Sequence, residues 1–105
     1  MIDIFIRKSG DHYTEFQVKG HAGYAERGKD IVCASVSALT IALENSLGAL
    51  SDVPILTKQY VNEEIPHIYI PVPSDKTDVM IESYRIGIEG VQEAYPDYVK
   101  LHLET

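Results

Sequence analysis

The fold is decided around residues 29–39, which read Lys29-Asp30-Ile31-Val32-Cys33-Ala34-Ser35-Val36-Ser37-Ala38-Leu39. Before this stretch, apolar and polar residues alternate, which is the pattern of a strand. From Ile31 onward, apolar residues recur every three or four positions, which is the pattern of a helix packed on one side. Asp30 is a preferred N-cap residue. We therefore predict a helix that begins at Ile31 and ends near Leu50, ahead of Pro54.

The sequence before this helix predicts a β-hairpin. Residues 2–7 and 14–19 both alternate between apolar and polar side chains, and Ser9-Gly10-Asp11 between them is typical of a turn. The segment from Gly20 to Lys29 contains three glycines and has no periodicity. We expect it to be a loop that leads from the hairpin into the helix.

The sequence after the helix predicts two further strands, a second helix and a last strand. The two strands are expected at residues 55–61 and 67–72, the second helix begins after Ser74 or Asp75, and residues 99–103 alternate as a final strand. Gly87 and Gly90 lower helix propensity, so we expect a neighbour to pack close to the backbone there. The resulting order, β-β-α-β-β-α-β, predicts a single α/β domain over residues 1–105, with a largely antiparallel sheet and two long helices.

Length and composition restrict the location of the protein. With 105 residues, of which 45% are hydrophobic, the chain has material for one core. No run of apolar residues approaches the roughly 20 that a membrane-spanning helix needs, and the N-terminus lacks the basic region of a secretory signal. A single cysteine excludes an intramolecular disulfide, and a free thiol is typical of a reducing compartment. We expect a cytoplasmic protein.

The charge of the chain restricts its partners. Sixteen acidic and nine basic side chains give a formal net charge of −7. This balance disfavours nonspecific binding to nucleic acid, which requires Lys and Arg to neutralise phosphates. It suits a basic partner, such as a Lys/Arg-rich peptide, although the same charge also serves solubility alone.

Cys33 and His21 are the candidate catalytic residues. Cys33 lies in the first turn of the predicted helix, where unpaired N–H groups and the helix dipole favour a thiolate over a thiol. His21, in the glycine-rich loop, is a candidate base that takes the thiol proton and later donates one to a leaving amine. The alternatives are an ordinary loop histidine and a cysteine that is packed as a small hydrophobic residue.

Asp30 and Ser37 are the candidate supporting residues. Asp30 is placed to orient His21, although its capping role explains it equally well. Ser37 lies one turn after Cys33 on the same face of the helix, where it can contact substrate or bond its own preceding carbonyl. The N–H groups at the start of the helix are candidates for an oxyanion hole. Tyr24 is either part of a pocket for a hydrophobic substrate residue or an exposed loop residue.

The sequence predicts neither a metal site nor a cofactor site. The spacing of His12, His21, His67, His102 and Cys33 does not resemble a zinc motif, and there is no glycine-rich phosphate-binding motif.

The motif around the candidate dyad resembles that of a known protease family. The residues are Gly20-His21-Ala22 and, after the loop, Asp30-Ile31-Val32-Cys33-Ala34, followed by Ser37. This pattern, and the length and element order of the whole chain, resemble the ribosomal-processing cysteine proteases, the Prp family. The resemblance implies that Cys33 is the nucleophile and His21 the general base, with supporting or substrate-binding roles for Asp30 and Ser37.

The resemblance also implies a substrate and an assembly. Members of this family remove a short, basic N-terminal extension from large-subunit ribosomal protein 27, cut after a hydrophobic residue and form homodimers. For this chain we therefore expect a ribosomal protein precursor as partner, no cofactor, and no direct binding to nucleic acid or a membrane.

Two other functions compete with proteolysis at this stage. In the first, the chain is a non-catalytic ribosome-associated module that binds a peptide or assists assembly, and Cys33 is incidental. In the second, Cys33 is a redox sensor, because an exposed thiolate is also readily oxidised. The absence of a second, resolving cysteine counts against the redox sensor.

Overall fold

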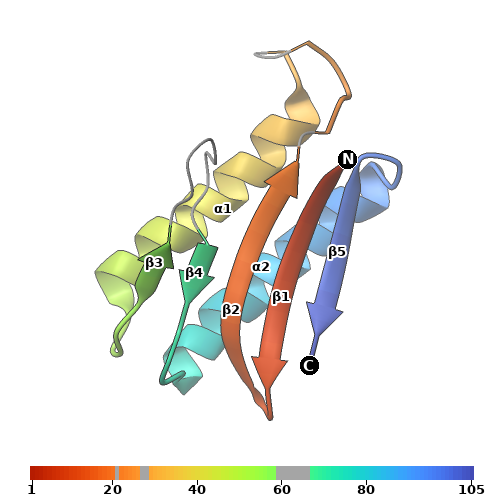
Figure 1. The fold of residues 1–105 in the computed structure, drawn as a ribbon. Helices are drawn as coiled ribbons and strands as arrows, with labels where there is room; N and C mark the ends of the chain where they lie inside the picture. Colours follow the sequence, from red (N-terminus) through yellow and green to blue (C-terminus); the bar gives the residue numbers. More distant parts are fainter. Residues whose placement is uncertain (21, 27–28, 59–66) are drawn as a thin grey trace.

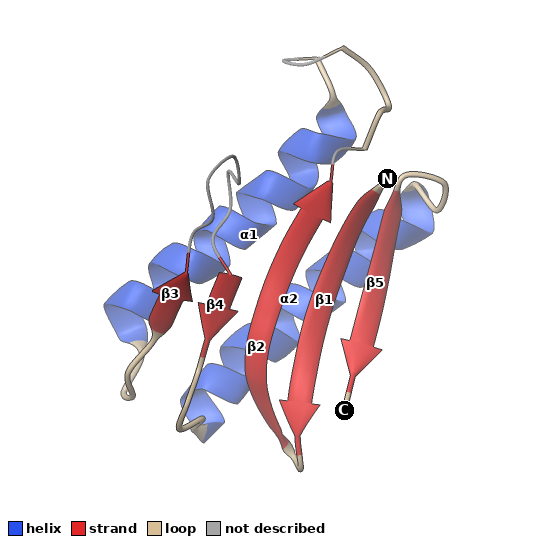
Figure 2. Ribbon diagram, in the orientation of Figure 1, coloured by secondary structure: helices blue, strands red, loops and turns tan. Residues whose placement is uncertain are grey.

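The computed structural model describes residues 1–20, 22–26, 29–58 and 67–105 and places two helices behind a five-stranded sheet (Figures 1 and 2). The elements follow the predicted order β-β-α-β-β-α-β. They are β1 (Ile2–Ser9), β2 (His12–Gly20), α1 (Ile31–Leu50), β3 (Leu56–Lys58), β4 (His67–Tyr69), α2 (Asp75–Ala94) and β5 (Val99–Glu104).

The sheet has the strand order β3-β4-β2-β1-β5. The hairpin β1–β2 forms its centre, and β4 and β3 continue it in antiparallel fashion on one side. On the other side, β5 pairs with β1 in parallel, with Ile4 opposite Leu101. The chain reaches this parallel position through α2, which crosses behind the sheet (Figure 1). The predicted fold class, an α/β domain with a largely antiparallel sheet, is confirmed.

The hydrophobic core lies between the sheet and the helices. Alternate residues of β1 point inward, and each helix contributes one face, as the periodicities predicted. The fully buried side chains from the strands include Ile4, Ile6, Phe16 and Ile68, and those from the helices include Val36, Leu47, Ile81 and Ile88. This core holds α1 in place, and therefore the end of α1 that carries Cys33.

The two helices also contact each other, which tests the prediction for the glycines of α2. A Cβ at Gly87 would lie 3.4 Å from the Leu39 methyl groups of α1, so the expected close approach is confirmed there. At Gly90, none of the described residues outside the helix lies within 4 Å of the Cβ position, and that part of the prediction is wrong. In addition, Thr40 of α1 and Tyr84 of α2 share a buried hydrogen bond of 2.7 Å.

Two predictions for the middle of the chain need correction. The described parts of β3 and β4 are three residues each, and residues 59–66, including the predicted turn at 62–64, lie outside the described residues.

Moreover, α1 is apolar enough to count as a candidate membrane span, with a mean hydropathy of 1.5 over a window of which 28% is buried. The sequence reading missed this because small and hydroxyl residues interrupt the large apolar ones.

Candidate functional site

Asp30 caps the helix that carries Cys33. Its backbone is extended (φ −83°, ψ 100°), and one carboxylate oxygen accepts hydrogen bonds from the N–H groups of Val32 (3.0 Å) and Cys33 (2.9 Å). These groups would otherwise be unpaired at the helix start. The predicted N-cap is therefore confirmed, and α1 begins at Ile31.

The same carboxylate also holds the preceding loop. The second oxygen of Asp30 accepts a hydrogen bond from the N–H of Tyr24 at 3.1 Å. The hydrogen bond from Cys33 N–H, aided by those from Tyr24 and Val32, lowers the pKa of Asp30 against the opposing effect of desolvation. Asp30 is thus an ionised link between the loop and the first turn of α1.

The Cys33 thiol is half-buried and lies against this loop. Its Sγ accepts a hydrogen bond from the backbone N–H of Ala22 at 3.2 Å. Ala22 is itself buried, and it is the residue directly after His21 in the sequence. An N–H directed at sulfur stabilises a thiolate more than a thiol, because the donated hydrogen faces a full negative charge.

His21, the predicted base, lies outside the described residues, and its role stays a prediction. Its neighbours on both sides are described. Gly20 ends β2 at φ +86°, and a Cβ there would collide with the carbonyl oxygen of Met1. Only glycine fits such a turn without strain. Ala22, on the other side, donates to the Cys33 sulfur.

Ser37 lies one turn after Cys33 and is half-buried. Within the described part of the chain, its hydroxyl forms no hydrogen bond, whereas the hydroxyl of Ser35 donates to the carbonyl of Ile31 at 2.7 Å. Ser35 therefore forms a hydrogen bond to the preceding turn of the helix, and Ser37 does not form the corresponding bond that was considered for it. The hydroxyl of Ser37 remains available for a substrate or a water, and its role stays a prediction.

Three of the N–H groups at the helix start, those of Val32, Cys33 and Ala34, already have hydrogen-bond acceptors within the protein. The N–H groups of Val32 and Cys33 donate to the Asp30 side chain, and that of Ala34 donates to the Asp30 carbonyl at 3.0 Å. The N–H that faces the sulfur comes from Ala22 in the loop. Sequence reasoning missed this donor, because a backbone group has no signature in the side-chain pattern.

Three tyrosines gather beside the loop. Tyr24 is 43% exposed, and its ring packs edge-on against Tyr95 (centroids 5.7 Å apart) and Tyr98 (5.2 Å apart). Tyr95 and Tyr98 follow α2 and precede β5. Tyr24 is thus an exposed loop residue, yet it belongs to an aromatic surface that the spacing of the tyrosines did not reveal.

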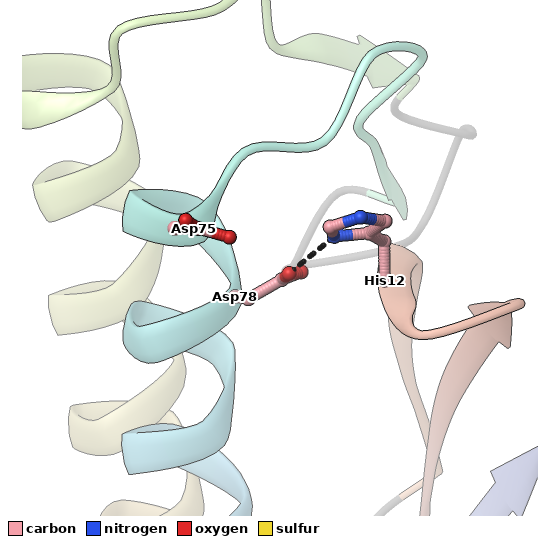
Figure 3. Close-up of side chains that lie close together, drawn as sticks. All are labelled: His12, Asp75 and Asp78. Atoms are coloured by element: carbon pink, nitrogen blue, oxygen red, sulfur yellow. Dashed lines mark hydrogen bonds and ion pairs between the residues drawn. The ribbon is translucent and has the colours of Figure 1, made fainter.

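A second cluster of titratable groups lies at the tip of the hairpin (Figure 3). His12, Asp75 and Asp78 offer ligand atoms within 4.8 Å of one another, although their linear spacing resembles no metal motif. The contacts present are those of a structural anchor. Asp78 pairs with Nδ1 of His12 at 2.5 Å and accepts the N–H of Tyr13 at 2.9 Å. Through its hydrogen bond and charge, Asp78 also raises the pKa of His12.

Comparison with known proteins connects this geometry to a family. Residues 1–100 match the family model described as cysteine protease Prp. The chain is 31% identical over 107 residues to the ribosomal processing cysteine protease Prp of Bacillus subtilis, covering 96% of each. It is 27% identical to the protein of the same name from Mycoplasma genitalium, covering 83% of this chain and 85% of that one.

Solved structures show the same fold. The Staphylococcus aureus ribosomal processing protease Prp, solved with a covalently linked product peptide, has a TM-score of 0.89 at 24% identity, with 98% of this chain and 99% of that chain covered. A Streptococcus mutans protein has a TM-score of 0.80 at 28% identity, with coverage of 100% and 95%.

Proposed function

The chain belongs to the Prp family of ribosomal processing cysteine proteases, and we propose that it removes the N-terminal extension of large-subunit ribosomal protein 27 by cutting after a hydrophobic residue. The observation that carries this proposal is the hydrogen bond from Ala22 N–H to Cys33 Sγ. This bond places Ala22, the residue after His21 in the sequence, against the thiol of Cys33 in the first turn of a capped helix.

In the proposed mechanism, Cys33 and His21 act as a dyad. His21 takes the thiol proton, and the Cys33 thiolate attacks the scissile carbonyl carbon to form a tetrahedral oxyanion. The C–N bond then breaks, and His21 gives its proton to the departing amine. Water, deprotonated by His21, attacks the thioester. The C–S bond breaks, His21 returns the proton that it took from water to the Cys33 sulfur, and the carboxylic acid product is released.

The oxyanion contact is assigned to the loop rather than to the helix. Asp30 already accepts the N–H groups of Val32 and Cys33. The Ala22 N–H is directed at the Cys33 sulfur. The carbon that carries the oxyanion becomes bonded to this sulfur, so the Ala22 N–H is within reach of the developing negative charge. Asp30 acts as a positioning residue, since it ties Tyr24 and Cys33 together.

Substrate recognition is assigned to the tyrosine surface and to charge. The rings of Tyr24, Tyr95 and Tyr98 offer an apolar surface beside the loop on which the hydrophobic residue before the cut can be buried. Ser37 Oγ is placed to bond the substrate backbone. The net charge of −7 attracts a basic extension peptide. The proposal includes a cytoplasmic location, a homodimeric state, no cofactor and no direct contact with nucleic acid.

The test is cleavage of a peptide that spans the extension junction, followed by mass spectrometry. We expect one cut by the wild type and none by Cys33→Ala. Ser35→Ala is the matched control, because Ser35 lies in the same stretch of helix and its hydroxyl bonds only its own helix. The Ser35→Ala variant should cleave like the wild type.

Other outcomes of this test would contradict the proposal. Cleavage by Cys33→Ala would exclude a cysteine nucleophile. Peptide binding without cleavage by the wild type, with the thiol titrated as free, would favour the binding module instead. A second test measures the rate at which Cys33 is alkylated at neutral pH. We expect slower alkylation in His21→Ala than in the wild type. Equal rates would exclude activation of the thiol by His21.

A further inference from the structure

Three side chains that can bind a metal ion meet where the tip of the hairpin contacts the start of α2 (Figure 3). His12 is the first residue of β2, and Asp75 and Asp78 lie in the first turn of α2. The ligand atoms of these three residues all lie within 4.8 Å of one another. Among the residues that the structure describes, this is the one such group of three histidine, cysteine or acidic side chains.

This group contains one carboxylate more than the pairing of a histidine requires. Each of the three histidines that the structure describes pairs with one carboxylate, and the pairs are His12–Asp78 (2.5 Å), His67–Glu15 (2.8 Å) and His102–Asp3 (2.9 Å). A second carboxylate completes a group of three only at His12, as far as the described residues go. The carboxylate of Asp75 forms no hydrogen bond or ion pair with a described residue. Asp75 is therefore left over once the pair is made.

The charge of the group suits a divalent cation. Two carboxylates and a neutral imidazole together carry a charge of about −2, which one divalent ion neutralises. A protonated His12 neutralises only one of the two carboxylates. A cation that contacts all three groups therefore relieves the repulsion between Asp75 and Asp78 that the ion pair leaves in place.

The geometry of Asp78 is that of a carboxylate held ready for a ligand. Its Oδ1 accepts the backbone N–H of Tyr13 at 2.9 Å, and its Oδ2 faces Nδ1 of His12. Tyr13 is buried, so this N–H is firmly placed. Carboxylates that bind metals are commonly fixed by such a second hydrogen bond. Asp75 lies three positions earlier, on the same side of the helix. A groove of about 420 Å³ borders Asp78 and leaves room for water beside it.

We propose that His12, Asp75 and Asp78 bind one divalent transition-metal ion, for which Zn²⁺ is the best match. Zinc binds imidazole nitrogen and carboxylate oxygen at about 2.0–2.2 Å, often with three protein ligands and one water. Mg²⁺ and Ca²⁺ prefer sites built from oxygen alone. The ion takes the place of the proton between Nδ1 and Asp78, and this proton is released to solvent.

The proposed site is structural, because it lies at the opposite end of α2 from Cys33. A helix of 20 residues is about 30 Å long. Asp75 begins α2, whereas Tyr95 follows its last turn and contacts Tyr24 in the loop before α1. The ion therefore joins the hairpin to α2 and does not touch the reacting atoms. This inference does not depend on the proposed protease activity.

The first experiment is calorimetric titration of the protein with zinc chloride. It uses a Cys33→Ala background, because a thiol also binds zinc. We expect one ion per chain, and Asp75→Asn should raise the dissociation constant by at least about tenfold. Asp11→Asn is the matched control. Asp11 and Asp75 are both exposed and both raise the pKa of His12 through their charge, but Asp11 is not one of the three ligands.

Three results of the titration would overturn the proposal. They are the absence of zinc binding, equal weakening by Asp11→Asn and Asp75→Asn, and binding of Mg²⁺ as tight as that of Zn²⁺. Equal weakening would mean that only the overall charge attracts the ion. Equal affinity for Mg²⁺ would mean that the imidazole of His12 is not a ligand.

The second experiment measures thermal unfolding with and without zinc chloride in the same background. Zinc should raise the melting temperature of the Cys33→Ala protein, because it binds the folded state, and should not raise that of His12→Ala. His102→Ala is the control, since it removes a similar pair with Asp3 and should keep the zinc effect. Each variant is compared with itself, so a lower starting stability of His12→Ala does not obscure the result. A zinc effect that persists in His12→Ala, or that is lost in His102→Ala, would contradict the assignment.

Discussion

Helices α1 and α2 have the same length, lie on the same face of the sheet and bury one apolar face each, yet their remaining surfaces differ. Helix α2 begins with a capping box in which Ser74 and Thr77 bond each other's backbone, and its exposed side carries the ion pairs of Arg85. These features stabilise a helix in water. Helix α1 lacks such ion pairs among its described residues, and its cap, Asp30, also binds the loop that precedes the helix.

This difference in caps and exposed surfaces indicates that α1, and not α2, is the helix that contributes to the candidate site. In α2, local interactions satisfy the helix ends and the solvent-facing side. In α1, the N-terminal cap and the thiol of Cys33 contact the preceding loop, and the outer face exposes apolar residues such as Ile31 and Ile41. The following predictions separate what the two helices share from what distinguishes them.

The inner faces should contribute equally to stability. Leu47 of α1 and Ile81 of α2 are 1% and 0% exposed. Truncation of either to alanine should lower the free energy of unfolding by about 2–5 kcal/mol, because each leaves a cavity in the core. Val79→Ala, at a position that is 69% exposed, is the control and should change it by less than about 0.5 kcal/mol. Chemical denaturation measures all three. A small effect at Leu47 alone would mean that α1 is held less firmly than its burial indicates.

The hydrogen bond between the helices should respond unequally to changes of its two partners. Thr40 Oγ donates to the Val36 carbonyl, so the Tyr84 hydroxyl is the donor to Thr40. Thr40→Val leaves that buried hydroxyl without its acceptor and should cost about 1–3 kcal/mol. Tyr84→Phe leaves Thr40 with its own bond intact and should cost about 1 kcal/mol. Denaturation curves that rank the two variants in the reverse order would contradict this assignment of donor and acceptor.

Loss of either N-cap side chain should lower the stability of the protein by a similar amount, but only loss of the α1 cap should lower peptide cleavage. Asp30→Ala and Ser74→Ala should each cost about 1 kcal/mol, since each removes an N-cap side chain. Asp30→Ala should also reduce peptide cleavage by about tenfold or more, because the loop loses its link to the helix. Ser74→Ala should cleave at the wild-type rate. Equal cleavage by both variants would show that Asp30 is a cap and nothing more.

The charged side of α2 should make a small, pH-dependent contribution to stability. Hydrogen bonds from Arg85 and then from Tyr13 lower the pKa of Glu82 to about 2. The stability that this carboxylate contributes is therefore present above pH 4.5 and is lost as the pH falls toward 2. Since the Glu82 side chain is 40% exposed, we expect less than about 1 kcal/mol. Acid denaturation of Glu82→Gln should be flatter over this range than that of the wild type, and an identical curve would contradict the expected linkage.

Much of this architecture was readable in the sequence, because the hydrophobic period is set by local geometry. The change from alternation to helical spacing at Ile31, the cap at Asp30 and the stop near Leu50 all appear in the structure. The motif around Cys33 led to the family that the comparisons show. The short strands β3 and β4 were less well predicted, since three-residue strands have almost no period of their own.

The site was readable only in part. Cys33 could be placed in the first helical turn, because a cap and a period are properties of neighbouring residues. The partner of its sulfur could not, since the Ala22 N–H is a backbone group in a loop without periodicity. Tyr24, Tyr95 and Tyr98 meet only because the connection between α2 and β5 lies beside that loop.

The sequence alone determined the elements, their order and the type of chemistry, because these depend on residue types at short separations. The tertiary structure decided which distant groups meet: Leu39 with Gly87, Thr40 with Tyr84, and Asp78 with His12. It also decided which face of α1 stays exposed. Both faces of that helix are apolar in the sequence, and only packing against the sheet determines that the face with Ile31 and Ile41 stays exposed.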